Sequence, residues 1–133
     1  MAPSWSSPIA ARWYWPQVPK PEWARRGWTW LHGRAIRFPQ EPTRREQARV
    51  LAEIWQFFAG LPCGECRGHA AAYYRAVPPD VTSGAALQVW AWRFHNSVNT
   101  RLGKPFYPFD VYRAEYGDEI SRAEWGDGCN DAF

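Results

Sequence analysis

Residues 43–66 have the sequence TRREQARVLAEIWQFFAGLPCGEC, which contains one complete helix pattern and the start of the next. Thr43 and Glu46 have the spacing of a capping box, in which each residue's side chain can bond the other's backbone amide. Apolar residues follow at positions 50, 51, 54, 57, 58 and 61, the spacing of an amphipathic helix. Gly60 and Pro62 are stop signals. This stretch therefore predicts a helix that ends just before a pair of cysteines.

Further helices are predicted on both sides of this one. The patterns cover residues 22–37, stopped by Phe38-Pro39, residues 63–76, stopped by two prolines, and a segment capped by Thr82 or Ser83 that continues to Leu102. A short fifth helix is expected around residues 108–116, and no strand-like alternation extends beyond a few residues. Because the connections are short, we predict an all-α fold: an antiparallel four-helix bundle plus a short fifth helix.

The two ends of the chain do not fit this pattern. Prolines at positions 3, 8, 16, 19 and 21 forbid a continuous helix over the first residues, so residues 1–21 are predicted to form an extended aromatic and proline-rich arm. Residues 118–133 are expected to form a C-terminal tail that contains Cys129. The first residues contain no clear targeting signal.

Composition excludes several classes of protein. The 133 residues carry a net charge of only +3 and no stripe of Lys or Arg, so we expect no nucleic-acid partner. No apolar run approaches the roughly 18–20 residues of a membrane span, and three cysteines are too few for a disulfide scaffold. Aromatic residues make up 17% of the chain, enough either to fill a core or to line a site for a flat ligand.

Cys63-Gly64-Glu65-Cys66 is the sharpest local motif. Two cysteines three residues apart at the start of a helix can form a disulfide, and the helix N-terminus lowers the pKa of a thiol there. Zinc needs four ligands, and beyond His69 no second pair lies at finger-like spacing, so no metal site is predicted. Haem attachment is excluded because Arg67, not His, follows the second cysteine. A thioredoxin-like site expects flanking strands, which leaves a redox dithiol on a helical scaffold.

Two predicted helix faces combine rings with polar groups. Trp92, His95, Asn96 and Asn99 share one face by spacings of three and four, and Arg25, Trp28 and His32 share another. These polar groups either bond neighbouring backbone or face a ligand, since buried amides need hydrogen-bond partners. Two such faces and a nearby dithiol favour a flat polar cofactor between helices.

Four sequence blocks together resemble the Erv/ALR family of FAD-dependent sulfhydryl oxidases over about residues 22–117. The blocks are Trp28-Thr29-Trp30-Leu31-His32, Phe38-Pro39, Pro62-Cys63-x-x-Cys66 and His95-Asn96-x-Val98-Asn99-x-x-Leu102-x-Lys104-Pro105. The resemblance implies a four-helix bundle with a short fifth helix, usually a homodimer, that holds FAD at the mouth of the bundle. It also implies oxidation of dithiols to disulfides in client proteins, with electrons passed to O₂ to give H₂O₂.

The resemblance also implies roles for individual residues. Cys63 would be the thiol that a substrate meets, and Cys66 would face the flavin. His95 and Tyr116 would sandwich the adenine, and Arg101 and Lys104 would meet the pyrophosphate charge. The full set of implied FAD-binding residues is Arg25, Trp28, His32, Trp92, His95, Asn96, Asn99, Arg101, Leu102, Lys104 and Tyr116.

The chain departs from the family pattern at several positions. Trp92 and Phe109 stand where the family usually has the two cysteines of a structural disulfide, so we expect an aromatic contact between them. Glu115 occupies a position where an Arg often contacts FAD. Cys129 is a lone cysteine where relatives often have a mobile second pair, and it is either a free thiol, an intermolecular bridge or half of a relay shared across a dimer.

Two functional hypotheses follow. The first is an active thiol:oxygen oxidoreductase that uses Cys63 and Cys66 on dithiol client proteins or a thioredoxin-like carrier. The second is a structural or assembly protein that keeps the bundle with little or no turnover. By family analogy the compartment is the mitochondrial intermembrane space, or the factory or virion of a large DNA virus.

Overall fold

The computed structural model describes the backbone of residues 20–125 and the side chains of residues 20–117. Five helices follow one another along this part of the chain, and it contains no strand. They are α2 (Glu22–Ile36), α3 (Arg44–Ala59), α4 (Gly64–Ala76), α5 (Gly84–Arg101) and α6 (Phe109–Trp125). The all-α prediction is confirmed. Residues 1–19 of the predicted arm and Cys129 lie outside the described residues.

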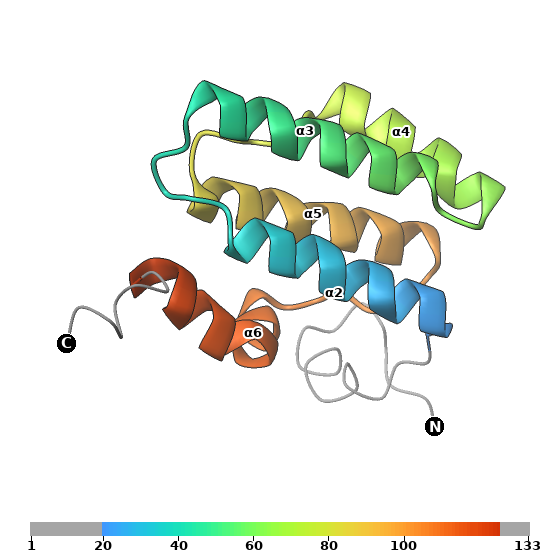
Figure 1. Ribbon diagram of the computed structural model, residues 1–133. Helices are drawn as coiled ribbons and strands as arrows, with labels where there is room; N and C mark the ends of the chain where they lie inside the picture. Colours follow the sequence, from blue (N-terminus) through green and yellow to red (C-terminus); the bar gives the residue numbers. More distant parts are fainter. Residues whose placement is uncertain (1–19, 126–133) are drawn as a thin grey trace.

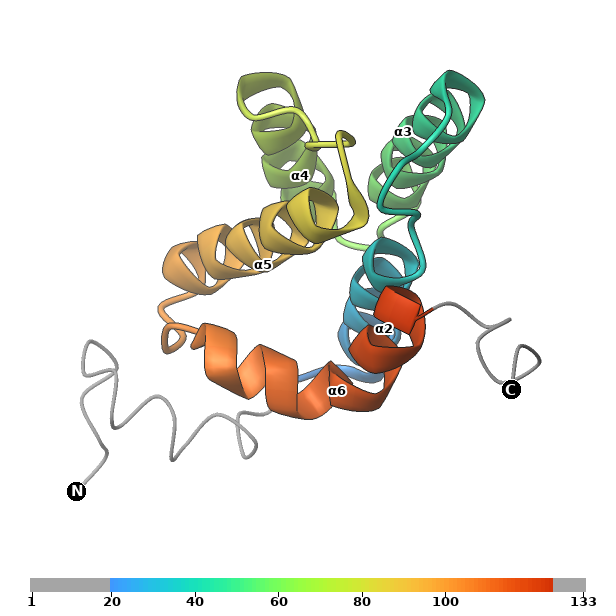
Figure 2. The same ribbon diagram turned by 90° about the vertical axis from the view of Figure 1, so that its left-hand side faces the viewer.

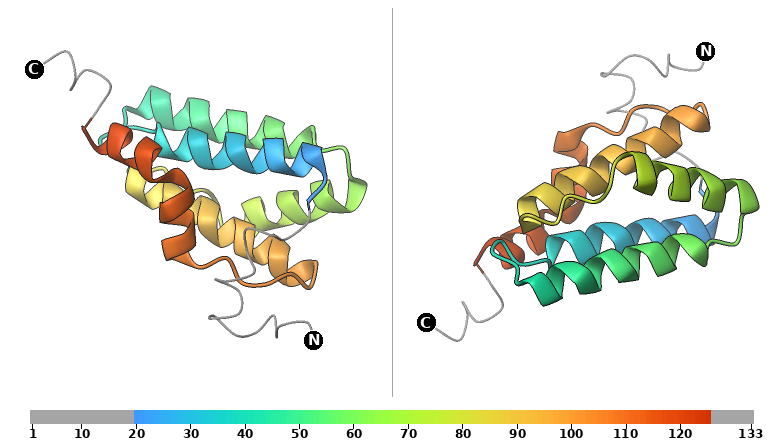
Figure 3. Two further views of the ribbon diagram at one scale, coloured as in Figure 1. Left: turned by 90° about the horizontal axis from the view of Figure 1, so that it is seen from below. Right: turned by 90° about the horizontal axis from the view of Figure 1, so that it is seen from above.

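Helices α2 to α5 form the four-helix bundle (Figure 1). Helix α2 packs along α5, and α3 packs along α4. Helix α6 crosses the bundle on the side of α2 and α5, away from α3 and α4 (Figures 2 and 3). In the described part of the chain, no helix combines the length and the apolar character that a membrane crossing requires.

Local sequence explains where the bundle helices begin. The capping box of α3 is formed, because the Glu46 amide donates to Thr43 Oγ1 at 3.1 Å and the Thr43 amide donates to Glu46 Oε1 at 2.9 Å. Ser83, not Thr82, caps α5, since its Oγ accepts from the Ala86 amide at 3.0 Å. The Thr82 hydroxyl is instead bonded to Asp80 Oδ1 at 2.6 Å.

Two glycines are required by the connections. Gly84 begins α5 so close to the preceding chain that a Cβ there would lie 2.3 Å from the carbonyl oxygen of Phe38. Gly103, just after α5, has a φ of 68°, a left-handed conformation that favours glycine. The chain can therefore turn sharply after α5 towards α6.

Helix α6 is longer than the sequence analysis predicted. The expected short helix over residues 108–116 is in fact Phe109–Trp125. The helix continues past Gly117 because a glycine inside a helix costs only about 1 kcal/mol and no proline follows it.

The core has two parts. The larger lies between the bundle helices and is centred on buried apolar side chains such as Leu31, Ile54, Phe58, Leu87 and Phe94. Full burial of a side chain of this kind contributes about 1.5–3 kcal/mol. The smaller part joins α6 to α2 through Ile36, Tyr107 and Tyr112. Because Tyr107 and Tyr112 lie before and within α6, this second cluster determines where α6 sits.

The connection between α5 and α6 is held by an aromatic contact and by side-chain hydrogen bonds. The rings of Trp92 and Phe109 meet edge to face with centroids 5.2 Å apart, which confirms the expected contact. Trp92 Nε1 donates to the Tyr107 carbonyl at 2.7 Å. Asn96 accepts from the Tyr107 amide at 2.6 Å and donates to the Tyr107 carbonyl at 3.1 Å. Both backbone groups of Tyr107 are thus bonded by side chains of α5.

Replacement of Trp92 by phenylalanine tests this connection. We expect Trp92→Phe to lower the free energy of unfolding by about 1–2 kcal/mol, since it removes one hydrogen bond and part of the ring contact. Trp55, which is 37% exposed, is the matched control, and Trp55→Phe should cost less than about 0.5 kcal/mol. Urea unfolding followed by far-UV circular dichroism measures both, and equal losses would contradict the assigned role of Trp92.

Candidate functional site

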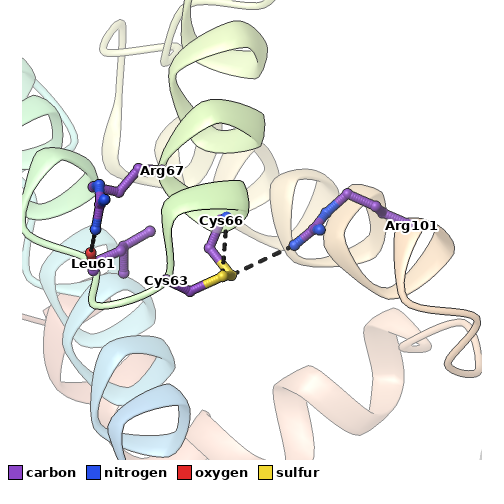
Figure 4. Close-up of a disulfide and its surroundings, with 5 residues drawn as sticks. All are labelled: Leu61, Cys63, Cys66, Arg67 and Arg101. Atoms are coloured by element: carbon purple, nitrogen blue, oxygen red, sulfur yellow. Dashed lines mark hydrogen bonds between the residues drawn. A yellow bond between two sulfur atoms is a disulfide. The ribbon is translucent and has the colours of Figure 1, made fainter.

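The two cysteines of the motif form a disulfide at the N-terminus of α4 (Figure 4). Cys63 is the N-cap residue and Cys66 lies in the first turn, with 5.1 Å between their Cα atoms. The Cys66 amide donates to Cys63 Sγ at 3.2 Å, so the sulfur takes the place that a serine oxygen takes in an ordinary cap. Both side chains are partly exposed. The predicted position of the pair at a helix tip is confirmed.

A cavity of about 250 Å³ opens beside this disulfide, between the start of α2, the start of α4 and the end of α5. Cys66 lines it, and Cys63 is not among its lining residues. Its walls are largely apolar, with Phe57, Leu61 and Val98 among them. Other residues that line it were singled out from the sequence, namely Trp28, Asn99, Arg101, Leu102 and Lys104. The structure therefore brings much of the predicted set to the same cavity as one of the two sulfurs.

Next to Trp28, which lines this cavity, His32 of α2 and His95 of α5 form a buried pair. His32 Nε2 and His95 Nδ1 are 2.9 Å apart and share one hydrogen. The indole of Trp28 stacks on the His95 ring, with centroids 3.7 Å apart and planes 3° from parallel. Tyr116 of α6 lies against His32, with ring centroids 5.2 Å apart. The two predicted polar faces therefore meet each other across α2 and α5.

Both histidines are neutral at physiological pH. Burial, reinforced by the nearby charge of Lys20, lowers the pKa of His32 to about 3. Burial and the neighbouring His32 lower the pKa of His95 well below its usual 6.5. A neutral pair can share one hydrogen bond without burying charge, which explains how two imidazoles can pack inside the bundle.

Two polar atoms at this site stand out among the side chains of residues 20–117. His32 Nδ1 and Asn99 Nδ2 are buried without a hydrogen-bond partner in that part of the chain. A buried donor or acceptor left unbonded costs about 1–3 kcal/mol. Such atoms are therefore candidates for contact with a bound polar group.

Cations surround the mouth of the cavity. Lys20, Arg101 and Lys104 all line it. Burial lowers the pKa of Lys20 to about 8, an effect partly offset by Glu115. Burial also lowers the pKa of Lys104. A group of cations beside an apolar cavity suits a ligand with a flat ring and a negatively charged part.

Several predicted residues lie elsewhere. Trp92 and Asn96 bond the backbone of Tyr107. Of the two alternatives given for these side chains, a bond to neighbouring backbone is therefore the one that the structure contains. Arg25 lies in a separate open hollow with Lys20 and Thr29. Glu115 accepts a hydrogen bond from the Tyr107 hydroxyl at 2.8 Å. Whether Trp92, Asn96 or Arg25 contacts a ligand stays a prediction.

Sequence reasoning missed other residues of the cavity. Phe57 comes from the end of α3, Leu61 from the turn that follows it, and His69 lies one turn after Cys66 on α4. His69 had a sequence signal, since the i+3 spacing places it on the face of Cys66. It is hydrogen-bonded to Ser97 Oγ at 3.2 Å. Among the described residues, no three His, Cys, Asp or Glu side chains are grouped as a metal site.

Comparison with known proteins agrees with this geometry. A model of the Erv1 / Alr family matches residues 25–118, a span that includes the disulfide and both histidines. The chain belongs to this family. The Erv1/Alr chain is 33% identical over 105 residues to an FAD-linked sulfhydryl oxidase of African swine fever virus, a match that covers 78% of this chain and 88% of the viral protein.

Plant and yeast relatives extend the likeness. The Erv1/Alr chain is 38% identical over 99 residues to the FAD-linked sulfhydryl oxidase ERV1 of Oryza sativa, with 74% of this chain and 50% of the rice protein covered. The crystal structure of the FAD-binding domain of Erv1 from Saccharomyces cerevisiae superposes with a TM-score of 0.70 at 27% identity. That match covers 77% of this chain and 97% of the yeast domain.

The buried histidines make the stability of this Erv1/Alr chain depend on pH. Because the unfolded chain binds protons near pH 6.5 and the folded His32 only near pH 3, stability is complete above pH 6.5 and falls as the pH is lowered. We expect a loss of about 1.5 kcal/mol per histidine between pH 6.5 and pH 5. Urea unfolding at intervals of half a pH unit measures this loss. His32→Gln should reduce the slope and His69→Gln should largely keep it, whereas a flat profile of the unsubstituted chain would contradict the assignment.

Proposed function

We propose that this chain is an FAD-linked sulfhydryl oxidase that makes disulfides in other proteins. The observation that carries the proposal is the position of Cys66, which is disulfide-bonded to Cys63 and lines the cavity that Asn99 and Trp28 also line. One sulfur of a redox pair is thereby next to a site for a flat ring, and the other is at the tip of a helix. The viral and plant relatives are named for the same activity.

The residues present fit FAD. The cavity of about 250 Å³ is close to the lower end of the usual range for ligand pockets, about 300–1,000 Å³, and its apolar walls suit a planar ring system. His32 Nδ1 and Asn99 Nδ2 are buried polar atoms without partners among the described side chains. Arg101 and Lys104 offer charge for a pyrophosphate. When bound, FAD would supply the capacity to take two electrons from a dithiol and pass them on.

We assign the cofactor to the residues that line the cavity or adjoin it. Trp28, Asn99, Arg101, Leu102 and Lys104 would hold it at the cavity. The adjoining ring cluster of His32, His95 and Tyr116 would complete the set. Arg25, Trp92 and Asn96 remain members of the proposed set through the family resemblance. In the structure, Trp92 and Asn96 bond the backbone of Tyr107, and Arg25 lines the open hollow with Lys20 and Thr29.

The chain's own chemistry begins with thiol–disulfide exchange. A client thiolate attacks Cys63 Sγ, the Cys63–Cys66 bond breaks, and the electron pair goes to Cys66 Sγ as a thiolate. A second client thiolate then attacks the client sulfur of the mixed disulfide and releases Cys63 as a thiolate. The client gains a disulfide and the pair is reduced. The Cys66 amide, which lies 3.2 Å from Cys63 Sγ, favours the negative charge on that sulfur.

The finer parts of the function also belong to this proposal. The electrons pass to O₂ and give H₂O₂, and the reductant is a dithiol client protein or a thioredoxin-like carrier that reaches Cys63 directly. We infer that the protein forms a homodimer, and analytical ultracentrifugation, which measures its mass in solution, checks this inference. By family analogy, the site of action is the mitochondrial intermembrane space or the factory or virion of a large DNA virus. Two relatives are named as mitochondrial and three are viral.

Removal of either sulfur of the pair tests the activity. We expect the purified chain to be yellow and to consume O₂ when given dithiothreitol. Cys63→Ser and Cys66→Ser should each lower O₂ consumption at least about 100-fold, because a single thiol cannot form the intrachain disulfide. Cys129→Ser is the matched control, since a small dithiol does not require a relay. An O₂ electrode and the flavin absorbance of each variant measure the result, and unchanged uptake in Cys66→Ser would refute the proposed chemistry.

The two asparagines of α5 offer a paired test of the cofactor site. Asn99→Leu removes a buried amide nitrogen, Nδ2, that has no partner among the described side chains. It should lower flavin affinity about 5- to 100-fold while stability without flavin stays equal or rises. Asn96→Leu leaves the Tyr107 amide without its partner and should lower stability by about 1–3 kcal/mol. Flavin titration and urea unfolding of the flavin-free protein separate the two effects. Equal flavin loss with equal destabilisation in both variants would contradict the assignment of Asn99.

A further inference from the structure

The two sulfurs of the disulfide have different electrostatic surroundings. Cys63 Sγ accepts a hydrogen bond from a neutral group, the Cys66 amide. Cys66 Sγ accepts one from a cation, since Nη2 of Arg101 at the end of α5 lies 3.7 Å away (Figure 4). Arg67, a cation on α4 itself, points the other way and donates to the Leu61 carbonyl at 2.6 Å. The positive charge that contacts the disulfide therefore comes from α5 and meets one sulfur.

This difference affects how a disulfide breaks. In thiol–disulfide exchange the sulfur that is not attacked leaves as a thiolate, and a leaving thiol of lower pKa leaves faster. An opposite charge within about 4–6 Å lowers a thiol pKa by about 1–3 units when it is shielded from solvent, and by less at the surface. Arg101 is exposed, so an effect below that range is expected.

We propose that Arg101 stabilises the thiolate of Cys66 as it leaves and thereby directs the attacking substrate thiolate to Cys63. This inference rests on the proposed function and adds a residue to its first step. In that step, the bond between the substrate sulfur and Cys63 Sγ forms and the bond between the two cysteine sulfurs breaks. The electron pair goes to Cys66 Sγ beside the guanidinium, the substrate sulfur is oxidised, and no proton is transferred.

Other titratable groups lie around the same cavity as Cys66. Lys20 from the segment before α2 and Lys104 from the segment after α5 line the cavity with Cys66, and so does His69 of α4. Burial, with the charge of Arg101, lowers the pKa of His69, so this imidazole is uncharged near neutral pH. Glu65 is adjacent to Cys66 in the chain and carries the opposite charge. The Arg101 guanidinium, by contrast, donates directly to Cys66 Sγ.

The pKa of the Cys66 thiol is the direct test. Full-length protein with Cys63→Ser and Cys129→Ser leaves one cysteine, and the rate of its alkylation by iodoacetamide between pH 5 and pH 10 gives its pKa. Adding Arg101→Gln should raise this pKa by about 0.5–1 unit, and Arg101→Lys should restore most of the difference. Salt should shrink the difference, because the contact is exposed.

Arg67→Gln is the matched control, since it removes the same charge from the same region without a contact to sulfur. It should leave the Cys66 pKa unchanged. If Arg67→Gln and Arg101→Gln raise the pKa equally, net charge is the cause and the proposal is refuted. An unchanged pKa in Arg101→Gln refutes it as well.

The direction of attack is tested on the oxidised pair. Cys129→Ser protein is mixed anaerobically with cysteamine, quenched with acid, alkylated and digested, and mass spectrometry locates the cysteamine adduct. We expect the adduct on Cys63, and Arg101→Gln should increase the share on Cys66 several-fold. Neither assay requires turnover with O₂, so both can succeed even if the proposed oxidase activity fails. An unchanged adduct ratio in Arg101→Gln overturns the proposal.

Discussion

The hydrogen bond between His32 and His95 holds together the two helices that carry most of the site. His32 lies on α2 and His95 on α5, and the 2.9 Å contact between their rings is buried. Such a bond needs at least one neutral ring, and burial keeps both rings neutral because a charged imidazole at this depth would be poorly solvated. Trp28 then stacks on His95, and Asn99 follows one turn further along α5. The position of the cavity wall therefore depends on a pair of uncharged histidines.

The disulfide reaches this wall through a different part of the fold. Helices α3 and α4 pack on each other, and the short turn between them places Cys63 at the tip of α4. Because Leu61 and Cys66 line the same cavity as Trp28, the end of the α3–α4 pair closes one side of a space whose other side is made by α2 and α5. Neither the α3–α4 pair nor the α2–α5 pair encloses the cavity alone. The position of the disulfide beside the cavity therefore depends on the packing of all four helices.

The sequence was informative where local rules apply. The capping box at Thr43 and the helix tip at Cys63 follow from spacing, and both are present. Spacing also placed His32 and His95 on two polar faces, but the cofactor was expected between those faces, and in the structure the two rings are hydrogen-bonded directly to each other. Periodicity was less informative about what covers a face. Asn96 and Asn99 lie three residues apart on α5, yet Asn96 bonds the backbone of Tyr107, whereas Asn99 lines the cavity. That difference comes from the path of the chain after α5, which brings Tyr107 next to Asn96. Helical periodicity predicts which residues share a face, but not which segment packs on that face.

The attachment of α6 shows how redox chemistry can be separated from folding. Among the described residues, Cys63–Cys66 is the disulfide of the fold, and α6 is held by the ring contact of Trp92 with Phe109 and by hydrogen bonds to Tyr107. A thiol oxidase must pass through a reduced state in every cycle, and reductants in its surroundings attack any accessible disulfide. Contacts between rings and amides are not changed by electron transfer. Helix α6 can therefore keep its place against His32 while the sulfurs change state, and the cavity wall need not be rebuilt between cycles.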